Sequence, residues 1–146
     1  SKLVDSNGIS LHTLIDKGSK HDSKFASEHL KSNIINTCTL KYKHSNRHKQ
    51  YFLADAAYDT KNIITTCNNY GYKVIIPQNI KNIKDPKKLR YLNKFEKKKY
   101  KNRIKVENHF SWIEHNKRLH CRYERYSHIF EEFVYFADLI IISKYL

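Results

Sequence analysis

The segment 51–76 limits the possible folds more than any other part of the chain. It begins with a short apolar run, Tyr51–Ala54, and ends with a second, Lys73–Ile76, which Pro77 terminates. The residues between them show a helical pattern that Gly71 closes, because glycine readily adopts the left-handed conformation that follows a helix. Strand, helix and strand in this order predict a βαβ unit with parallel strands and a right-handed crossover.

A β-hairpin and a helix are predicted on the N-terminal side of this unit. Asp5–Gly8 is a turn signal between the strand-like runs Lys2–Val4 and Ile9–Ile15, because asparagine and glycine tolerate positive φ. Asp22 or Ser23 then caps a helix with apolar residues at helical spacing.

Two helices are predicted on the C-terminal side. A long helical pattern runs from Phe95 to about Lys117, and Trp112 within it is interpreted as a core residue. The apolar residues of a final helix predict a wide inward face packed on the sheet. They are Ile129, Phe133, Phe136 and Ile140, with Phe130, Val134, Ala137 and Ile141 beside them. The segments 41–50 and 80–94 are predicted loops, and the chain is predicted to be a single α/β domain over residues 1–146.

The chain carries a large excess of positive charge. Its 146 residues include 28 lysines and arginines but 14 aspartates and glutamates, which gives a formal net charge of +14. The positive side chains repel one another unless an anionic partner neutralises them. The expected partner is therefore nucleic acid, an acidic membrane face or an acidic protein. Nucleic acid is favoured because the basic residues spread along the whole chain with aromatic residues among them. An AT-rich genome would also enrich lysine, so charge alone does not decide.

The cysteines and the apolar stretches predict an intracellular protein. Cys38, Cys67 and Cys121 are odd in number and far apart, which predicts reduced thiols, and the histidines near Cys121 match no common zinc spacing. No basic-then-apolar leader opens the sequence, and its most apolar stretch, 133–142, is too short to span a bilayer. No membrane contact and no small-molecule substrate are expected.

Asp55 stands where the first strand of the βαβ unit ends. Ligands of open α/β sheets bind beyond the carboxyl ends of the strands, so a carboxylate at this position is a candidate functional group. The alternative is that Asp55 begins the turn into the next helix or caps it, as aspartates often do. Position alone does not choose between these interpretations. Asp59 or Thr60 is the predicted cap of that next helix.

A polar stripe follows the predicted long helix. At about 100° per residue, its members fall within an arc of about 60°. They are Tyr100, Arg103, Glu107 and Glu114. Taken in isolation, Arg103 and Glu107 are four residues apart and would form an ordinary surface ion pair.

Several segments, taken in order, resemble one family. They are VDSNGISL, GSKHDS, LADAAYDT, the Y-x-x-R-x-x-x-E of the long helix, FSWIEHNKRL and RYER. Together they resemble the C-terminal part of a DDE transposase from a bacterial-type insertion sequence, over nearly the whole length of the chain. LADAAYDT is similar to the family's strand with the second catalytic aspartate, and Y-x-x-R-x-x-x-E to its segment with the catalytic glutamate.

The resemblance implies a fold, a chemistry and a set of site residues. The implied fold is an RNase H-like mixed sheet with flanking helices, here with the first strand missing. In the family, three carboxylates hold two Mg²⁺ or Mn²⁺ ions astride the scissile phosphate, because these hard ions prefer oxygen ligands. By resemblance, Asp55 and Glu107 are catalytic residues and metal ligands, and Tyr100 and Arg103 contact DNA phosphate. Two ions are expected only if a third carboxylate is supplied.

The sequence departs from the family pattern at two points. The family's first aspartate lies on a strand before the hairpin, and Asp5 is interpreted as a turn residue rather than its substitute. The family usually has a lysine seven residues after the glutamate, whereas this chain has Glu114, whose charge would repel DNA. Lys117, one turn further on, is the candidate replacement.

A basic cluster follows the polar stripe in the sequence. Its members are Lys117, Arg118, Arg122 and Arg125. They predict a phosphate-binding ridge or, with equal weight, a solvated basic face.

Three functions stay open. The leading hypothesis is a transposase catalytic domain that performs metal-dependent phosphodiester cleavage and strand transfer, and this chain alone is expected to be inactive because the first aspartate is absent. The alternative is a non-catalytic, basic DNA-binding protein derived from a mobile element. The third is a domain that acts only in an assembly, such as a homo-oligomer on DNA, with the missing strand supplied by an upstream chain. All three act inside the cell, wherever host or viral DNA resides.

Overall fold

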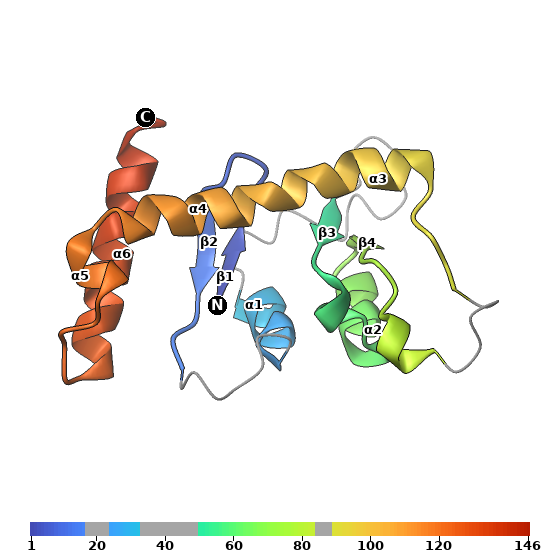
Figure 1. Ribbon diagram of the computed structural model, residues 1–146, viewed down its shortest axis with the longest axis horizontal. Helices are drawn as coiled ribbons and strands as arrows, with labels where there is room; N and C mark the ends of the chain where they lie inside the picture. The colour runs from blue at the N-terminus through green and yellow to red at the C-terminus, as the bar shows by residue number, and fades with distance from the viewer. Residues whose placement is uncertain (17–23, 33–49, 84–88) are drawn as a thin grey trace. The chain divides into compact units, whose positions relative to one another are not determined.

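The computed structural model describes residues 1–16, 24–32, 50–83 and 89–146 (Figure 1). The chain divides into two compact units. The first combines Ser1–Lys20 with Ile104–Leu146, and the second is His21–Arg103. Each unit combines helices with a two-stranded sheet, so the α/β class is confirmed. That residues 1–146 form a single domain stays a prediction.

The second unit contains the βαβ unit expected from the sequence. Strands β3 (Tyr51–Leu53) and β4 (Lys73–Ile75) are parallel, with Tyr51 opposite Lys73, and helix α2 (Lys61–Asn69) connects them. The helix and the strands, with the residues next to them, contribute several buried apolar side chains. They are Phe52, Ala54, Ile63, Cys67, Ile75 and Ile76.

Both ends of α2 are closed by the residues that the sequence singled out. The Thr60 hydroxyl accepts a hydrogen bond from the Ile63 N–H at 3.3 Å, so Thr60 is the N-cap. At the other end, Gly71 has a φ of 81°, and the N–H groups of Gly71 and Tyr72 donate to carbonyls of the last turn. The alternative prediction, that Asp59 caps α2, is wrong, because the Asp59 carboxylate accepts the Asn79 N–H at 2.9 Å instead.

Removing the Thr60 hydroxyl is expected to destabilise the protein measurably. Thr60→Ala leaves an orphan N–H in the first turn of α2 and is expected to lower the free energy of unfolding by about 1 kcal/mol. Urea unfolding followed by circular dichroism measures the change. Thr65→Ala, at an exposed position inside the same helix, is the matched control and is expected to be neutral or slightly stabilising.

Shorter elements complete the second unit. They are α1 (Ala26–Ser32), α3 (Lys94–Tyr100), and the 3₁₀ turns η4 (Ala56–Tyr58), η5 (Ile80–Asn82) and η7 (Lys101–Arg103). Helix α1 packs against α2. The turn 18–23 with its predicted caps Asp22 and Ser23, the loop residues 41–49 and 84–88, and Cys38 lie outside the described residues.

The first unit begins with the predicted hairpin. Strands β1 (Lys2–Val4) and β2 (Ser10–Thr13) are antiparallel. In the turn, Gly8 has a φ of 90°, and the Asp5 carboxylate accepts the N–H groups of Asn7 and Ile9, each at 2.8 Å. Both predictions, the hairpin and a turn role for Asp5, are confirmed.

Three helices follow in this unit: α4 (Ile104–Glu114), α5 (Lys117–His120) and α6 (Ser127–Ser143). The prediction of one uninterrupted helix from Phe95 to Lys117 is therefore wrong. The tighter turn η7 interrupts it before α4. At the other end, the backbone N–H and the side-chain amide of Asn116 both donate to the Ile113 carbonyl, which closes the last turn.

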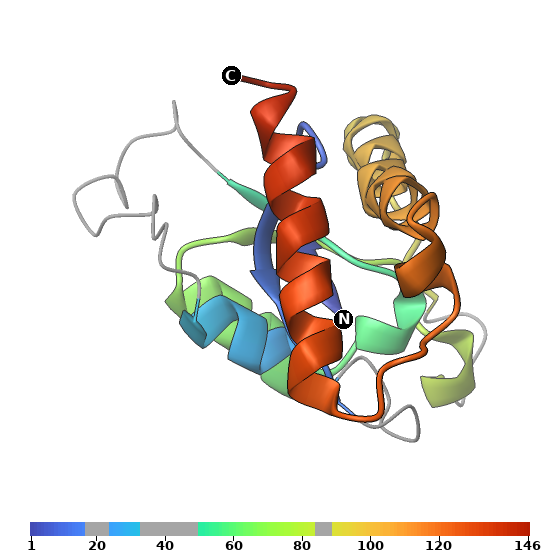
Figure 2. The same cartoon turned by 90° about the vertical axis from the view of Figure 1, so that its left-hand side faces the viewer.

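The core of the first unit lies between α4 and α6, with Leu119 of α5 packed against it, and Figure 2 shows α6 in front of the hairpin strands. Val134, Ala137 and Ile141 of α6 are buried, whereas Phe136 is 61% exposed and Ile140 is 40% exposed. The apolar face of α6 is thus rotated by about one residue from the predicted centre. Trp112 is 37% exposed, so its predicted place in the core is also wrong.

Two further predictions concern thiols and membranes. Cys67 and Cys121 are free cysteines, as expected, and burial raises the pKa of the Cys67 thiol to about 12. Within the described ranges, every helix is too short or too polar to cross a bilayer.

Candidate active site

Asp55 lies at the carboxyl end of β3, two residues beyond the strand, and is exposed. Its Oδ1 atom accepts the Ala57 N–H at 2.9 Å, which makes Asp55 the N-cap of η4. The two interpretations of this residue are therefore compatible, since a cap bond occupies one carboxylate oxygen. The cap also orients the side chain at the edge of the sheet.

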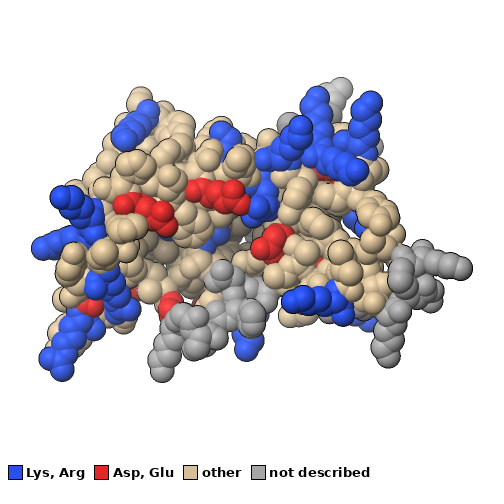
Figure 3. Space-filling view, in the orientation of Figure 1, with Lys and Arg blue, Asp and Glu red and all other residues tan. Residues whose placement is uncertain are grey.

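Glu107 lies in the first turn of α4 and is exposed. The buried side of the same helix carries His109 and Ile113, which are four residues apart. Glu114 follows Glu107 by seven residues, close to two helical turns, so both glutamates lie on the exposed face of α4. Figure 3 shows acidic side chains over this helix.

The predicted polar stripe is divided between the two units. Tyr100 and Arg103 belong to the second unit, where the Arg103 guanidinium carbon lies 6.0 Å from the centre of the Tyr100 ring. Glu107 belongs to the first unit. The 3₁₀ turn η7 lies between Tyr100 and Glu107, and a common row of the four side chains stays a prediction.

Asp55 and Glu107 also belong to different units. Each carboxylate is fixed within its own unit, and their sharing of metal ions stays a prediction. Among the described residues, no three His, Cys, Asp or Glu side chains gather as a metal site would require.

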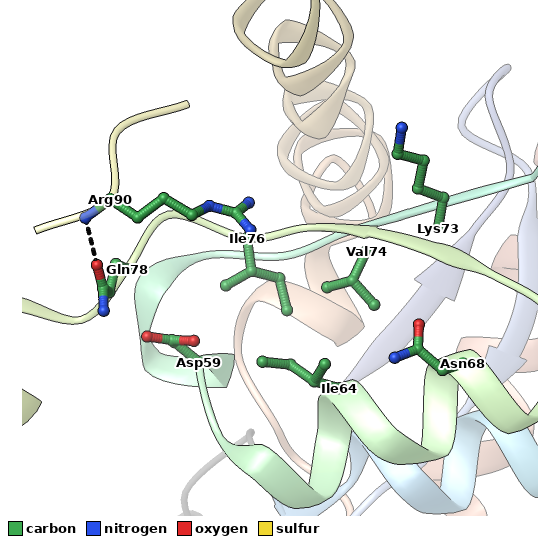
Figure 4. A pocket seen from close by; sticks show the side chains of 8 residues that line it. All are labelled: Asp59, Ile64, Asn68, Lys73, Val74, Ile76, Gln78 and Arg90. Atoms are coloured by element: carbon green, nitrogen blue, oxygen red, sulfur yellow. Dashed lines mark hydrogen bonds between the residues drawn. The ribbon is translucent and has the colours of Figure 1, made fainter. Parts of the chain in front are cut away.

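A pocket of about 420 Å³ lies in the second unit beside β4 and α2 (Figure 4). Asp59, Asn68, Gln78 and Arg90 line it with apolar residues of the βαβ unit. The Arg90 N–H donates to Gln78 at 2.5 Å, and Asp59 is already bonded to Asn79. Asp55 does not line this pocket, so it is distinct from the candidate active site.

Two arginines of the predicted basic ridge are held over aromatic rings. The Arg118 guanidinium carbon lies 4.7 Å from the centre of the Phe133 ring, and that of Arg122 lies 5.4 Å from the Phe130 ring. Both rings are half-buried on α6, whereas both arginines and Lys117 are exposed. A guanidinium stacked by one face still presents its N–H edges outward, which suits it to bind phosphate.

A buried polar network lies behind α4 and was not predicted. Lys2 donates to both carboxylate oxygens of Asp138 at 2.6 Å, and Thr13 donates to the same carboxylate at 3.2 Å. His109, which is 0% exposed, contacts Asp138 through Nε2 at 3.0 Å and the Gly8 carbonyl through Nδ1 at 2.7 Å. This network joins the hairpin, α4 and α6.

Both partners of His109 are hydrogen-bond acceptors. The Gly8 carbonyl faces one ring nitrogen and the Asp138 carboxylate the other, so the ring is held at both nitrogens. Burial by itself raises the pKa of Asp138, but the hydrogen bonds and charges of His109 and Lys2 outweigh it and hold that pKa below its ordinary value. Burial lowers the pKa of Lys2, which Asp138 offsets only in part.

The network holds α4 in place two residues beyond Glu107. One sequence signal pointed to it: Asp138 is a lone charge within an otherwise apolar helical run. A buried carboxylate requires partners, and these lie near the opposite end of the chain and on α4.

The chain matches one family model. The model is described as a transposase DDE domain, and the match covers residues 3–137. No curated protein and no solved structure matches the chain.

Proposed function

Because the chain belongs to the transposase DDE domain family, we propose that it is a catalytic domain that cuts and rejoins DNA by metal-dependent phosphoryl transfer. The family match carries this proposal, since it spans both Asp55 and Glu107. The proposed fold is RNase H-like. The parallel βαβ unit with a carboxylate beyond β3 supports it.

Asp55 and Glu107 are the proposed metal ligands. Both are exposed oxygen donors, which suits Mg²⁺ or Mn²⁺, and Asp55 keeps one oxygen outside its cap bond. Divalent ions, when bound, would activate the attacking hydroxyl and stabilise the leaving oxygen. Two ions require a third carboxylate. Asp5 is not proposed for this role, because its carboxylate organises the hairpin turn by accepting two backbone N–H groups.

The proposed partner is DNA. Arg118 and Arg122, held over their rings, and Lys117 beside them would bind phosphates. Tyr100 and Arg103 are proposed to contact phosphate near the reacting bond. In this arrangement Glu107 on α4 would face metal ions and not the phosphate directly.

Nicking of supercoiled plasmid DNA tests the proposed activity. The longest protein that the reading frame encodes is incubated with Mg²⁺ or Mn²⁺, and residues 1–146 alone are compared with it. Metal-dependent nicking is expected from a protein that supplies the third carboxylate. The 146-residue chain alone is expected to nick at least about 100-fold more slowly, because loss of metal stabilisation costs several kcal/mol.

A second candidate is a non-catalytic DNA-binding protein. The net charge of +14 favours it as strongly as the first, and no three-ligand cluster occurs in the described residues. DNA binding without nicking by the longest encoded protein would support this candidate and contradict the first. A homo-oligomer on DNA is compatible with either.

Arg118 and Arg122 are expected to contribute to DNA affinity through phosphate contacts. Replacing both by glutamine is expected to reduce the slope of log affinity against log salt by about 2, since each phosphate contact contributes about 0.9. Fluorescence anisotropy with a labelled duplex measures the slope. Lys61→Gln with Lys144→Gln removes the same charge from other exposed positions. An equal fall in this control would mean that the arginines act only through net charge.

A further inference from the structure

Three lysines of helix α3 and its C-cap lysine, the first residue of η7, lie on one face. Their spacing of i, i+3, i+4 and i+7 places them in a single row along the helix. They are Lys94, Lys97, Lys98 and Lys101, here called the lysine face. All four are exposed, and Lys101, the C-cap, keeps helical angles with φ −55° and ψ −28°. Figure 3 shows basic side chains gathered over α3.

The other side of α3 is anchored to β3. The Phe95 and Tyr51 rings lie 6.0 Å apart, and the Lys99 ammonium lies 5.3 Å from the centre of the Tyr51 ring. Asn93 and Glu96 form a capping box that fixes the first turn. The helix therefore presents the lysine face outward in a fixed orientation.

The lysine face has no acidic neighbours on its own helix that could neutralise it. Each lysine has another at three or four positions, and such like-charge pairs destabilise a helix. Glu96 is the acid of α3, but its carboxylate accepts the Asn93 N–H and lies 3.6 Å from Arg90. A polyanion would relieve this repulsion along the whole row, which spans about 10 Å of helix axis.

We propose that the lysine face of α3 is a binding surface for the phosphate backbone of duplex DNA. It is separate from Arg118 and Arg122, which belong to the other unit. The proposal rests on DNA as the partner in the proposed function, but not on catalysis. It extends the DNA contact beyond the residues that surround the reacting phosphate.

The chemistry of the lysine face favours DNA over other anionic partners. A membrane-bound amphipathic helix inserts an extended apolar side, whereas the apolar residues of α3 are Tyr100 and Phe95, which is 49% exposed beside the Tyr51 ring. Protein interfaces centre on aromatic or aliphatic anchors and are depleted in lysine, whereas this row contains lysine alone. Rows of exposed ammonium groups without apolar anchors are typical of phosphate-backbone contact.

The experiment measures duplex binding against salt. The full chain carries all four changes Lys94→Gln, Lys97→Gln, Lys98→Gln and Lys101→Gln. Glutamine is nearly as good a helix former as lysine, and circular dichroism verifies the fold. Anisotropy of a labelled 30-base-pair duplex, about three helical turns, is read between about 50 and 200 mM NaCl. The control carries four charge losses at exposed positions elsewhere in the same unit, namely Lys24→Gln, Lys31→Gln, Lys61→Gln and Lys81→Gln.

In the lysine-face variant, the slope of log affinity against log salt is expected to be smaller in magnitude by about 3 to 4. When the salt concentration rises fourfold, the affinity of the unchanged chain is expected to fall by a factor about 100 times larger than the factor by which the variant's affinity falls. The control is expected to keep most of the slope. Equal slopes in the two variants, or no change in the lysine-face variant, would overturn the proposal.

Two further measurements distinguish DNA from a membrane as the partner, and DNA binding from catalysis. If the variant loses binding to phosphatidylserine vesicles but keeps its duplex affinity, the partner is a membrane and the proposal fails. Plasmid nicking is measured in parallel. Nicking with an unchanged salt slope contradicts only the lysine face, whereas a reduced slope without nicking supports the lysine face and contradicts only the catalytic proposal.

Discussion

Asp55→Asn and Glu107→Gln are each expected to weaken binding of Mn²⁺ to the DNA-bound protein by at least about tenfold. Loss of outer-shell partners alone costs about 10- to 100-fold in metal affinity, and a direct ligand matters more. Electron paramagnetic resonance of free Mn²⁺ measures the affinity. Any metal-dependent cleavage is expected to fall at least about 100-fold in either variant.

The double variant tests whether the two carboxylates share ions. Ligands of one site act as a unit, so Asp55→Asn combined with Glu107→Gln is expected to lose little more than either change alone. Fully additive losses would show that the residues bind separate ions. Cleavage that survives Glu107→Gln would remove that residue from the proposed site.

Two neighbouring carboxylates serve as matched controls. Asp59 is four residues from Asp55 but bonded to Asn79, and Glu114 shares the exposed face of α4 with Glu107. Asp59→Asn and Glu114→Gln are expected to leave Mn²⁺ affinity unchanged. Glu114→Gln is also expected to strengthen duplex binding slightly, because it removes a negative charge from that face.

Asp138→Ala is expected to lower the free energy of unfolding by about 3–5 kcal/mol. The change leaves the ammonium of Lys2 and the ring of His109 buried without their shared partner. Urea unfolding measures the loss. Glu132→Ala, at an exposed position on the same helix, is the control and is expected to change stability by less than about 0.5 kcal/mol.

A second variant tests whether the stability loss in Asp138→Ala comes from the unpaired buried charge. Lys2→Met combined with Asp138→Leu replaces the buried ion pair by apolar side chains, so that only the His109 ring loses a partner. It is expected to lose less stability than Asp138→Ala. A greater loss in the combined variant would mean that packing, rather than the buried charges, explains the effect.

The contribution of Asp138 depends on pH in a definite direction. Its pKa in the folded protein lies below the ordinary value of 3.8, so the folded state binds the proton less readily than the unfolded state. The stabilisation is therefore fully present above that ordinary value and is lost as the pH falls through the lowered folded pKa. The stability difference between the protein and Asp138→Asn is expected to shrink in that acid window.

Local sequence signals located the elements correctly where one or two residues decide the backbone. Thr60 and Gly71 close α2, and the Asp5 carboxylate organises the hairpin turn, because caps and turns depend on neighbouring residues. Neighbouring residues in the sequence did not reveal which row of α6 side chains is buried. Both rows are apolar, and the hydrogen bonds of Asp138 to Lys2 and Thr13 orient the helix.

The candidate site was predictable only in its parts. The position of Asp55 beyond a strand followed from the βαβ pattern, and the exposure of Glu107 followed from its place on an amphipathic helix. The turn η7 between Tyr100 and Glu107 was not foreseen, since periodicity does not reveal a local 3₁₀ turn. The buried His109 was missed because a histidine carries no apolar signal.

The first unit is assembled from both ends of the chain, with Ser1–Lys20 and Ile104–Leu146 on either side of an intervening unit. Lys2 leaves the ribosome 136 residues before its partner Asp138. During synthesis the hairpin cannot form its contacts with α6 until that helix has been made, whereas the βαβ unit is complete earlier. Until α6 has been synthesised, the hairpin lacks the helix that carries its buried counter-charge, and such incomplete intermediates are prone to aggregation.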